Sequence, residues 1–204
     1  MTRKEADFIF KYFLLKRKVV TKMFKDGYLN EYEESHGVLG DEQVPGTYAC
    51  FADLIMERLL LDFLPLMEKH TELKLVPTYS YARLYKKGDI LKRHKDRPEC
   101  EISTTLNLGG DPWPLFIDPT GKDSVIDETT NLVKANAPKG KKILMKPGDM
   151  LVYRGFDLEH WREPFEGDVC AQVFLHYNDA TSKTINKYDS RPFIGLPSWF
   201  KGRK

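Results

Sequence analysis

Short apolar segments separated by glycine-containing turns fill the middle of this chain and constrain its fold more than any other feature. Most of these segments are rich in Val, Ile, Thr and Tyr or alternate apolar with polar residues, as half-buried β-strands do. The expected strands are Leu75–Tyr85, Cys100–Leu108, Leu115–Ile117, Lys142–Met145, Met150–Tyr153, Asp157–Trp161 and Asp168–Tyr177. Strands at this spacing predict a β-sandwich or a barrel.

Two helical segments are expected before these strands. Phe8, Tyr12 and Leu15 recur at helical spacing, which predicts an amphipathic helix near the start. A second helix is expected over Ala49–His70, with Pro65 as a kink or an early end. The predicted fold class is therefore mainly β with supporting helices, an α+β arrangement.

The 204 residues are long enough to bury a sizeable core in one domain. Residues 1–48 are expected to be a helix and a loop packed on that core. Residues 49–180 are expected to be the β-domain with its support helix. Residues 181–204 are polar, with scattered prolines, and predict a tail laid along the surface.

The composition limits where and with what the protein works. With 32 basic and 30 acidic side chains the net charge is +2, without the strongly basic balance typical of nucleic-acid binding. Three cysteines with no CxxC pair argue against a disulfide framework. No stretch reaches the roughly 18–20 uncharged apolar residues of a membrane helix, and no signal-peptide cleavage site follows the basic start. We therefore expect a cytoplasmic protein without a membrane partner.

A small set of histidines carries the chemical signal. His94 and Asp96 form a His-x-Asp pair, whose side chains leave a strand end on the same side. About 0.7 such matches are expected here by chance, so the pair alone is weak. His160 follows a turn and an apolar strand. Two histidines and a carboxylate suit one face of an iron(II) ion, which leaves positions for a co-substrate and oxygen. Zinc-dependent hydrolysis with the same ligands is the chemical alternative.

Four motifs in a fixed order strengthen this interpretation. They are Tyr85-Lys86-Lys87-Gly88 starting nine residues before His94, Leu106-Asn107-Leu108-Gly109-Gly110, the segment Lys146–Tyr153, and His160 with Pro164 four residues on. Together they resemble the 2-oxoglutarate/Fe(II)-dependent dioxygenases, in the prolyl 4-hydroxylase form found in compact bacterial and phage enzymes. The similarity runs from about Tyr79 to Tyr177. It implies a double-stranded β-helix (a cupin-like jelly roll) preceded by two long helices.

The resemblance also implies roles for particular residues. His94, Asp96 and His160 would bind iron(II), and Tyr85 would donate its hydroxyl to the distal carboxylate of 2-oxoglutarate. The implied cofactors are Fe(II) and 2-oxoglutarate as co-substrate, with ascorbate as an optional reductant. The protein's share of the chemistry would be positioning and the exclusion of water.

One position departs from the family pattern. The family normally places Lys or Arg about ten residues after the second histidine, where this chain has Cys170. A buried carboxylate without a cation is costly, so another cation is required. Strand alternation places Arg162 on the face of His160, which makes it the first choice as the 2-oxoglutarate anchor, with Arg83 second. Gln172 is expected to face the same interior.

The expected function is hydroxylation of a peptidyl residue, proline first, with decarboxylation of 2-oxoglutarate to succinate. The expected partners are 2-oxoglutarate, dioxygen and a peptide or protein. A nucleic-acid dealkylase is the nearest alternative, since basic residues cluster around the His-x-Asp pair; these are Lys86, Lys87, Lys92, Arg93, Lys95 and Arg97. The arginine-rich run that dealkylases carry after the second histidine is missing. A non-catalytic jelly-roll binding module is the third alternative.

Overall fold

The computed structural model describes residues 1–30 and 33–201, which form a mostly β structure with two long helices. The helices are α1 (Arg3–Lys25) and α2 (Leu54–Thr71), with 3-10 turns at Glu34–His36, Pro98–Cys100 and Lys187–Ser190. The strands are β1 (Tyr48–Phe51), β2 (Leu75–Lys86), β3 (Leu91–His94), β4 (Ile102–Gly110), β5 (Leu115–Ile117), β6 (Val125–Asp127), β7 (Leu132–Val133), β8 (Lys141–Ile143), β9 (Met150–Tyr153), β10 (His160–Arg162) and β11 (Val169–Asp179).

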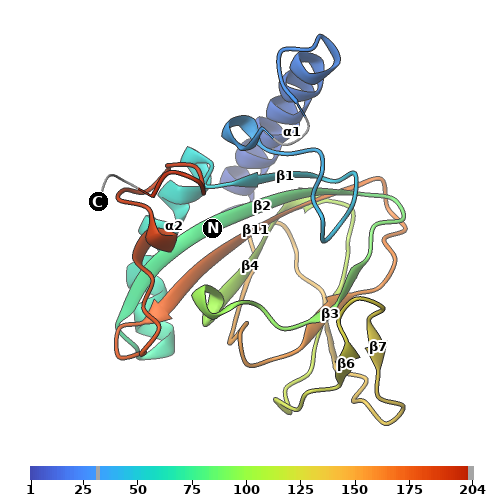
Figure 1. The fold of residues 1–204 in the computed structure, drawn as a ribbon, viewed down its shortest axis with the longest axis vertical. Helices are drawn as coiled ribbons and strands as arrows, with labels where there is room; N and C mark the ends of the chain where they lie inside the picture. The colour runs from blue at the N-terminus through green and yellow to red at the C-terminus, as the bar shows by residue number, and fades with distance from the viewer. Residues whose placement is uncertain (31–32, 202–204) are drawn as a thin grey trace.

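The strands form two principal antiparallel sheets. The major sheet has the order β1-β2-β11-β4-β9, and the minor sheet has the order β3-β10-β5-β8. The paired strands β6 and β7 form a separate small sheet, which lies at the opposite end of the molecule from α1 (Figure 1). The architecture is jelly-roll-like, which agrees with the predicted fold class.

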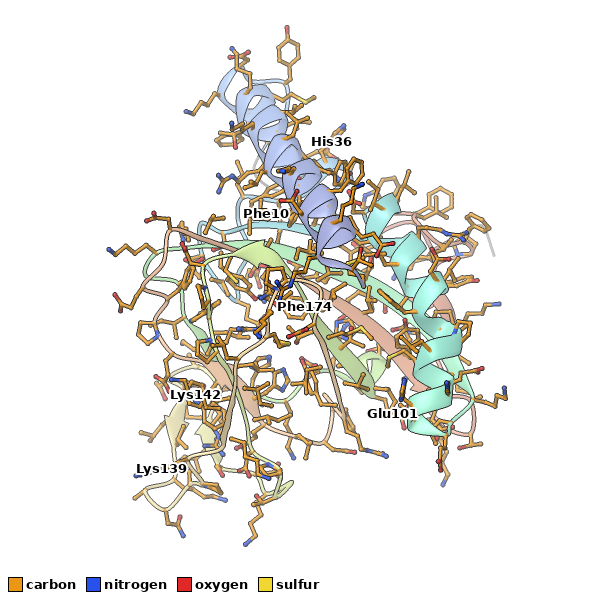
Figure 2. All side chains as sticks on the ribbon, turned by 180° about the vertical axis from the view of Figure 1, so that it is seen from behind. Phe10, His36, Glu101, Lys139, Lys142 and Phe174 are labelled. Carbon is orange, nitrogen blue, oxygen red and sulfur yellow. The ribbon has the colours of Figure 1, made fainter. Side chains whose placement is uncertain are left out.

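The central strand β11 shows how the sequence builds two different faces of the major sheet. Ala171, Val173 and Leu175 are fully buried in the core formed with the helices. Cys170 and Phe174 alternate with them and pack toward the minor sheet. Both helices lie on the same side of the major sheet (Figure 2). The predicted alternation is confirmed, and it leaves the inner face of the sheet free to line a site.

Helix α1 forms where expected, but of the three predicted side chains only Tyr12 packs against the core, where it is half-buried. Phe8 and Leu15, on which the prediction rested, are 69% and 61% exposed. Ile9, Phe13 and Val20 pack against the major sheet instead. Both sets follow the helical period, so periodicity alone does not choose between them. The contacts with the major sheet determine which face of α1 is buried.

The second helix starts later than predicted. The segment Tyr48–Phe51 is strand β1, which pairs with β2, whereas a helix was expected from Ala49. Ala52 then has a positive φ of 54°, which turns the chain. Asp53 follows as the N-cap and accepts hydrogen bonds from the backbone N–H groups of Ile55 and Met56.

Pro65 does not end α2, contrary to one of the two expected outcomes. The helix continues to Thr71, because Leu60 and Met67 pack on the core on either side of the proline. The predicted strand Asp157–Trp161 also needs correction. The N–H groups of Asp157 and Leu158 donate to the Arg154 carbonyl in a turn, so the strand begins only at His160.

The C-terminal segment is fixed to α2 by a buried contact. Arg191 is 3% exposed, and its Nη2 atom donates to Glu57 Oε2 at 3.1 Å. Within residues 1–30 and 33–201, no helix combines the length and the apolar content needed to cross a membrane.

We predict that Phe13→Ala lowers the free energy of unfolding by about 3–5 kcal/mol, because Phe13 is fully buried between α1 and the major sheet. Phe8→Ala on the same helix is the matched control and should change it by less than about 0.5 kcal/mol. Chemical denaturation of both variants measures the difference. Equal losses would show that α1 does not pack through Phe13.

Candidate metal and co-substrate site

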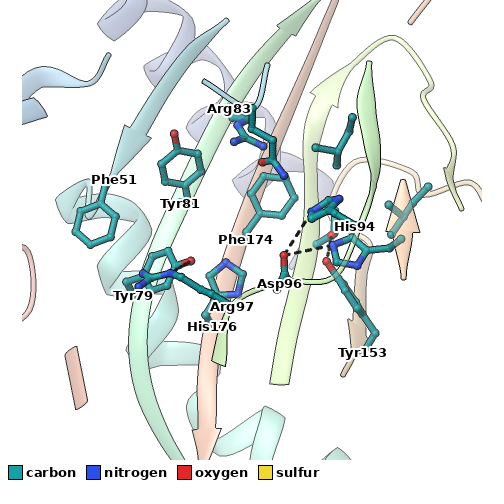
Figure 3. Close-up of a pocket in the computed structure, with 15 residues that line it drawn as sticks. Phe51, Tyr79, Tyr81, Arg83, His94, Asp96, Arg97, Tyr153, Phe174 and His176 are labelled. Carbon is teal, nitrogen blue, oxygen red and sulfur yellow. Dashed lines mark hydrogen bonds and ion pairs between the residues drawn. The ribbon is translucent and has the colours of Figure 1, made fainter. Parts of the chain in front are cut away.

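Two antiparallel strands bring the predicted metal ligands together. His94 ends β3 and His160 begins β10, and the two residues are direct cross-strand partners. Their ring centroids are 4.3 Å apart. Asp96 Oδ1 lies 3.5 Å from the Nε2 atom of each histidine (Figure 3). One ligand atom from each of the three residues therefore falls within 4.8 Å of the other two.

Backbone carbonyls determine which nitrogen each imidazole presents. His94 Nδ1 lies 2.7 Å from the Lys92 carbonyl oxygen, and His160 Nδ1 lies 3.0 Å from that of Leu158. A carbonyl can only accept, so each Nδ1 carries a proton and Nε2 is the nitrogen that faces Asp96. Metal-binding histidines in proteins show this same arrangement. The donor set fits a divalent metal ion between the two Nε2 atoms and the carboxylate.

Asp96 is held as a carboxylate. Burial raises the pKa of Asp96, but the neighbouring His160 and His94 imidazoles outweigh this effect and hold the pKa well below its usual value. Its Oδ2 atom accepts a hydrogen bond from Ser103 Oγ at 3.2 Å. A Cβ at Gly155 would lie 2.3 Å from the same oxygen, so only glycine fits beside this carboxylate.

Asp96 also belongs to a second potential ligand set, with Cys100 and His176. His176 Nδ1 lies 2.9 Å from Ser103 Oγ, and its ring packs on Tyr79 with centroids 4.6 Å apart. Burial lowers the pKa of His176 to about 4, so its imidazole is neutral at pH 7. His176 is not part of the set that contains His94 and His160.

Buried polar atoms without partners gather between the two sheets. Among the described residues, the buried side-chain atoms that lack a hydrogen bond are Tyr85 Oη, Asn107 Oδ1, Arg162 Nε, Arg162 Nη2 and Gln172 Oε1. Gln172 pairs across strands with Asn107, and Tyr85 pairs with Cys170 on the same strand as Gln172. Each unpaired buried polar group costs free energy, so this set fits a polar ligand that would satisfy it.

The two arginines proposed as anchors have different surroundings. Arg162 is fully buried, and the only hydrogen bond of its side chain among the described residues runs from Nη1 to the Trp113 carbonyl. Burial lowers the pKa of Arg162, as expected for a guanidinium without a carboxylate beside it. Arg83 instead forms two hydrogen bonds to Asp41, at 2.9 and 3.1 Å. Arg83 is therefore already neutralised by Asp41, although it lines the cavity at the metal ligands, whereas buried Arg162 has no carboxylate partner among the described residues.

Two hollows reach the candidate metal ligands. A cavity of about 270 Å³ is lined by His94, Asp96 and His160 together with an aromatic wall that includes Phe51, Tyr79 and Tyr81 (Figure 3). A larger groove of about 880 Å³ also reaches His94 and Asp96, and the β6–β7 hairpin forms one of its sides. A small co-substrate and a larger substrate could thus approach the same centre.

The basic cluster near the His-x-Asp pair is largely neutralised. Lys86, Arg93, Lys95 and Arg97 form ion pairs with Asp89, Glu159, Asp123 and Asp189, respectively. Arg93 is buried as well. No local pattern predicts these pairings, because most of the partners lie far away along the chain. The roles of Ser103 and Gly155 beside Asp96 were missed for the same reason.

Comparison with known proteins identifies the fold. No protein-family model and no curated protein matches the sequence. AviO1 from Streptomyces viridochromogenes Tue57 matches in structure with a TM-score of 0.59 and 19% identity, over 89% of this chain and 87% of AviO1. HygX from Streptomyces hygroscopicus, solved with nickel and 2-oxoglutarate bound, has a TM-score of 0.52 and 14% identity, over 69% and 73% of the two chains.

A third similar structure is SnoN, a non-haem α-ketoglutarate-dependent epimerase from nogalamycin biosynthesis. Its TM-score is 0.55 at 14% identity, over 84% of this chain and 73% of SnoN. Identities this low speak to the fold and not to the reaction. The chain shares its fold with AviO1, HygX and SnoN, which agrees with the fold that the sequence resemblance implies.

Proposed function

We propose that this protein is an iron(II)- and 2-oxoglutarate-dependent oxygenase built on a double-stranded β-helix. The observation that carries the proposal is the meeting of His94, Asp96 and His160, with both Nε2 atoms directed at one carboxylate. Two histidines and one carboxylate on a single face are typical of non-haem iron(II) oxygenases. The fold shared with AviO1, HygX and SnoN supports the same assignment.

The unpaired polar atoms between the sheets supply the second part of the proposal. Arg162 would bind the distal carboxylate of 2-oxoglutarate through Nε and Nη2, and Tyr85 would donate its hydroxyl to the same group. A planar guanidinium suits a carboxylate because it offers parallel N–H donors. Gln172 and Asn107 lie in the same buried set, but their unpaired atoms are amide oxygens and their NH2 groups donate to Cys170 Sγ and to the Met145 carbonyl, so they are not assigned to the carboxylate.

Iron(II) and 2-oxoglutarate, when bound, supply the activation of dioxygen for C–H oxidation, with release of succinate and carbon dioxide. The residues of this chain do the positioning. The carbonyls of Lys92 and Leu158 keep the imidazoles in the ligating tautomer. The aromatic wall of Phe51, Tyr79 and Tyr81 limits the access of water to the centre. Ascorbate would keep the iron reduced between turnovers.

For the substrate, we favour a peptidyl residue, with proline first. Proline-rich segments dock in grooves lined with aromatic side chains, and the cavity beside the metal ligands has such a wall. The motifs that resemble prolyl 4-hydroxylases point to the same substrate. The ion pairs made by Lys86, Arg93 and Lys95 leave little free positive charge for a nucleic acid, so the dealkylase alternative is weaker.

A small natural product is the second candidate substrate. HygX has been solved with hygromycin B bound, at a TM-score of 0.53, and SnoN is an epimerase from nogalamycin biosynthesis. The same scaffold therefore serves small-molecule chemistry in proteins that share its fold. The groove of about 880 Å³ is large enough for such a ligand.

We predict succinate formation when the protein is incubated aerobically with iron(II), ascorbate and 2-oxoglutarate. Asp96→Ala should abolish it, because the carboxylate is the only acidic member of the ligand set. Succinate is quantified with a proline-rich peptide, with hygromycin B and with single-stranded DNA, and the true substrate class should raise its rate. A wild-type protein that makes no succinate under any of these conditions would refute the oxygenase assignment.

We predict that Arg162→Met raises the dissociation constant of 2-oxoglutarate by roughly 30-fold or more. Removing one partner of a buried charge pair costs about 2–5 kcal/mol, and 1.4 kcal/mol corresponds to a factor of ten. Arg154→Met is the control, since Arg154 is exposed and pairs with Asp157 at the surface. Calorimetric titration of 2-oxoglutarate into the metal-loaded protein gives both constants. An unchanged affinity in Arg162→Met would remove this residue from the site.

A further inference from the structure

A buried ion pair joins the two strands that carry the histidines. Arg93 immediately precedes His94, and Glu159 immediately precedes His160. Neighbouring residues in an extended chain point to opposite faces, so this pair lies on the far side of the strands from the imidazoles. Arg93 Nε donates to Glu159 Oε2 at 2.6 Å, and both side chains are less than a tenth exposed.

Arg93 also holds both ends of the long segment between β5 and β8. Its Nη2 atom donates to Asp118 Oδ2 at 2.7 Å, and its Nη1 atom donates to the Pro138 carbonyl at 2.7 Å. Its guanidinium stacks 4.2 Å from the centre of the Trp161 ring. One buried side chain therefore connects residues 118 and 138 with the strand that leads to His94.

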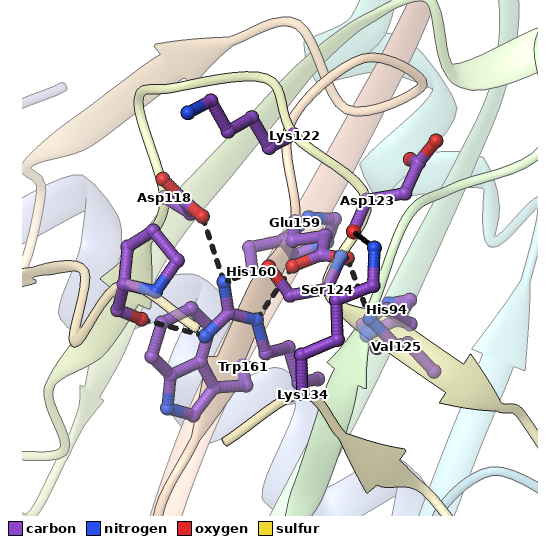
Figure 4. Close-up of polar contacts among 12 residues, drawn as sticks. His94, Asp118, Lys122, Asp123, Ser124, Val125, Lys134, Glu159, His160 and Trp161 are labelled. Carbon is purple, nitrogen blue, oxygen red and sulfur yellow. Dashed lines mark hydrogen bonds and ion pairs between the residues drawn. The ribbon is translucent and has the colours of Figure 1, made fainter. Parts of the chain in front are cut away.

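Glu159 fixes the β6–β7 hairpin from the other strand. Its Oε1 atom accepts hydrogen bonds from the backbone N–H groups of Ser124 and Val125, the second at 3.0 Å (Figure 4). Val125 opens β6, and the hairpin lines the same groove as His94 and Asp96. The carboxylate of Glu159 thus links the β6–β7 wall of the groove to the residue that directly precedes His160.

The same backbone sets the orientation of the imidazoles. His94 Nδ1 donates to the carbonyl of Lys92, and His160 Nδ1 donates to the carbonyl of Leu158. Each accepting carbonyl belongs to the residue just before Arg93 or Glu159. A shift of either paired residue would rotate the peptide group that holds its imidazole.

We propose that Arg93 and Glu159 are positioning residues for the metal centre, and that their ion pair couples the two imidazoles to the β6–β7 wall of the substrate groove. The inference rests on the proposed function, since it assumes that His94, Asp96 and His160 hold a metal. Outer residues that orient metal-binding histidines commonly change metal affinity by 10–100-fold.

A purely structural role is the alternative, and the chain offers a matched control for it. Glu57 is as buried as Glu159, at 2% exposed. It also accepts two backbone N–H groups, from Ser80 and Gly195, and pairs with Arg191. Glu57 lies on α2 and does not line either hollow at the metal ligands. Glu57→Gln should therefore destabilise the fold without disturbing the metal centre.

The test is an anaerobic titration of cobalt(II) into the wild type, Glu159→Gln and Glu57→Gln, followed by the visible absorption of the bound ion. We expect the dissociation constant to rise about 10–100-fold in Glu159→Gln, with a changed absorption spectrum. Glu57→Gln should match the wild type in both respects. Arg93→Lys should resemble Glu159→Gln, because lysine lacks the fork that reaches Glu159 and Asp118 together.

Hydrogen–deuterium exchange of the wild type provides a test that needs no variant. Cobalt(II) should protect the amides of Ser124 and Val125 from exchange, since their carboxylate partner is next to a ligand. The inference is overturned if Glu159→Gln binds cobalt(II) with the wild-type affinity and spectrum. It is also overturned if Glu159→Gln and Glu57→Gln lose the same amount of affinity for cobalt(II). If neither Glu159→Gln nor Arg93→Lys folds, unchanged exchange at these amides overturns it. A wild type that binds no cobalt instead overturns the proposed function.

Discussion

The antiparallel pairing of β3 with β10 is the constraint on which the rest of the site depends. It places His160 opposite His94, although the two residues are far apart in the sequence. The chain then needs only two further residues to bring Asp96 within 3.5 Å of both Nε2 atoms. A slip of one residue in this register would turn one imidazole to the opposite face. The buried contact between Arg93 and Glu159 is well placed to prevent such a slip.

Apolar packing under the two helices offsets the free-energy cost of the buried polar groups between the sheets. Because α1 and α2 cover one face of the major sheet with apolar side chains, the larger of the two hydrophobic clusters lies outside the space between the sheets. The inner face can then carry Tyr85 Oη, Arg162 Nε and Nη2, and Gln172 Oε1, which are buried and have no hydrogen-bond partner among the described residues. Leaving such groups unpaired opposes folding, so their presence is best understood as preparation for a ligand.

Local patterns in the sequence were sufficient for some features and not for others. The alternation of side chains in β11 can be read from neighbouring residues, and the structure shows it. The motifs that contain His94 and His160 are also short local patterns, and the structure brings these two histidines together. The packed face of α1 and the burial of Arg93 depend on contacts with distant segments, so no local pattern contains them. The placement of Arg162 by strand alternation brought it into the buried interior, while its role toward 2-oxoglutarate remains a proposal.

The central claim is that the side chains of His94, Asp96 and His160 hold an iron(II) ion that binds 2-oxoglutarate. Anaerobic visible absorption spectroscopy tests it most directly, because a keto acid chelated to iron(II) gives a metal-to-ligand charge-transfer band that neither component shows alone. We expect this band when iron(II) and 2-oxoglutarate are both added to the protein. Its absence at saturating concentrations of both would contradict the account.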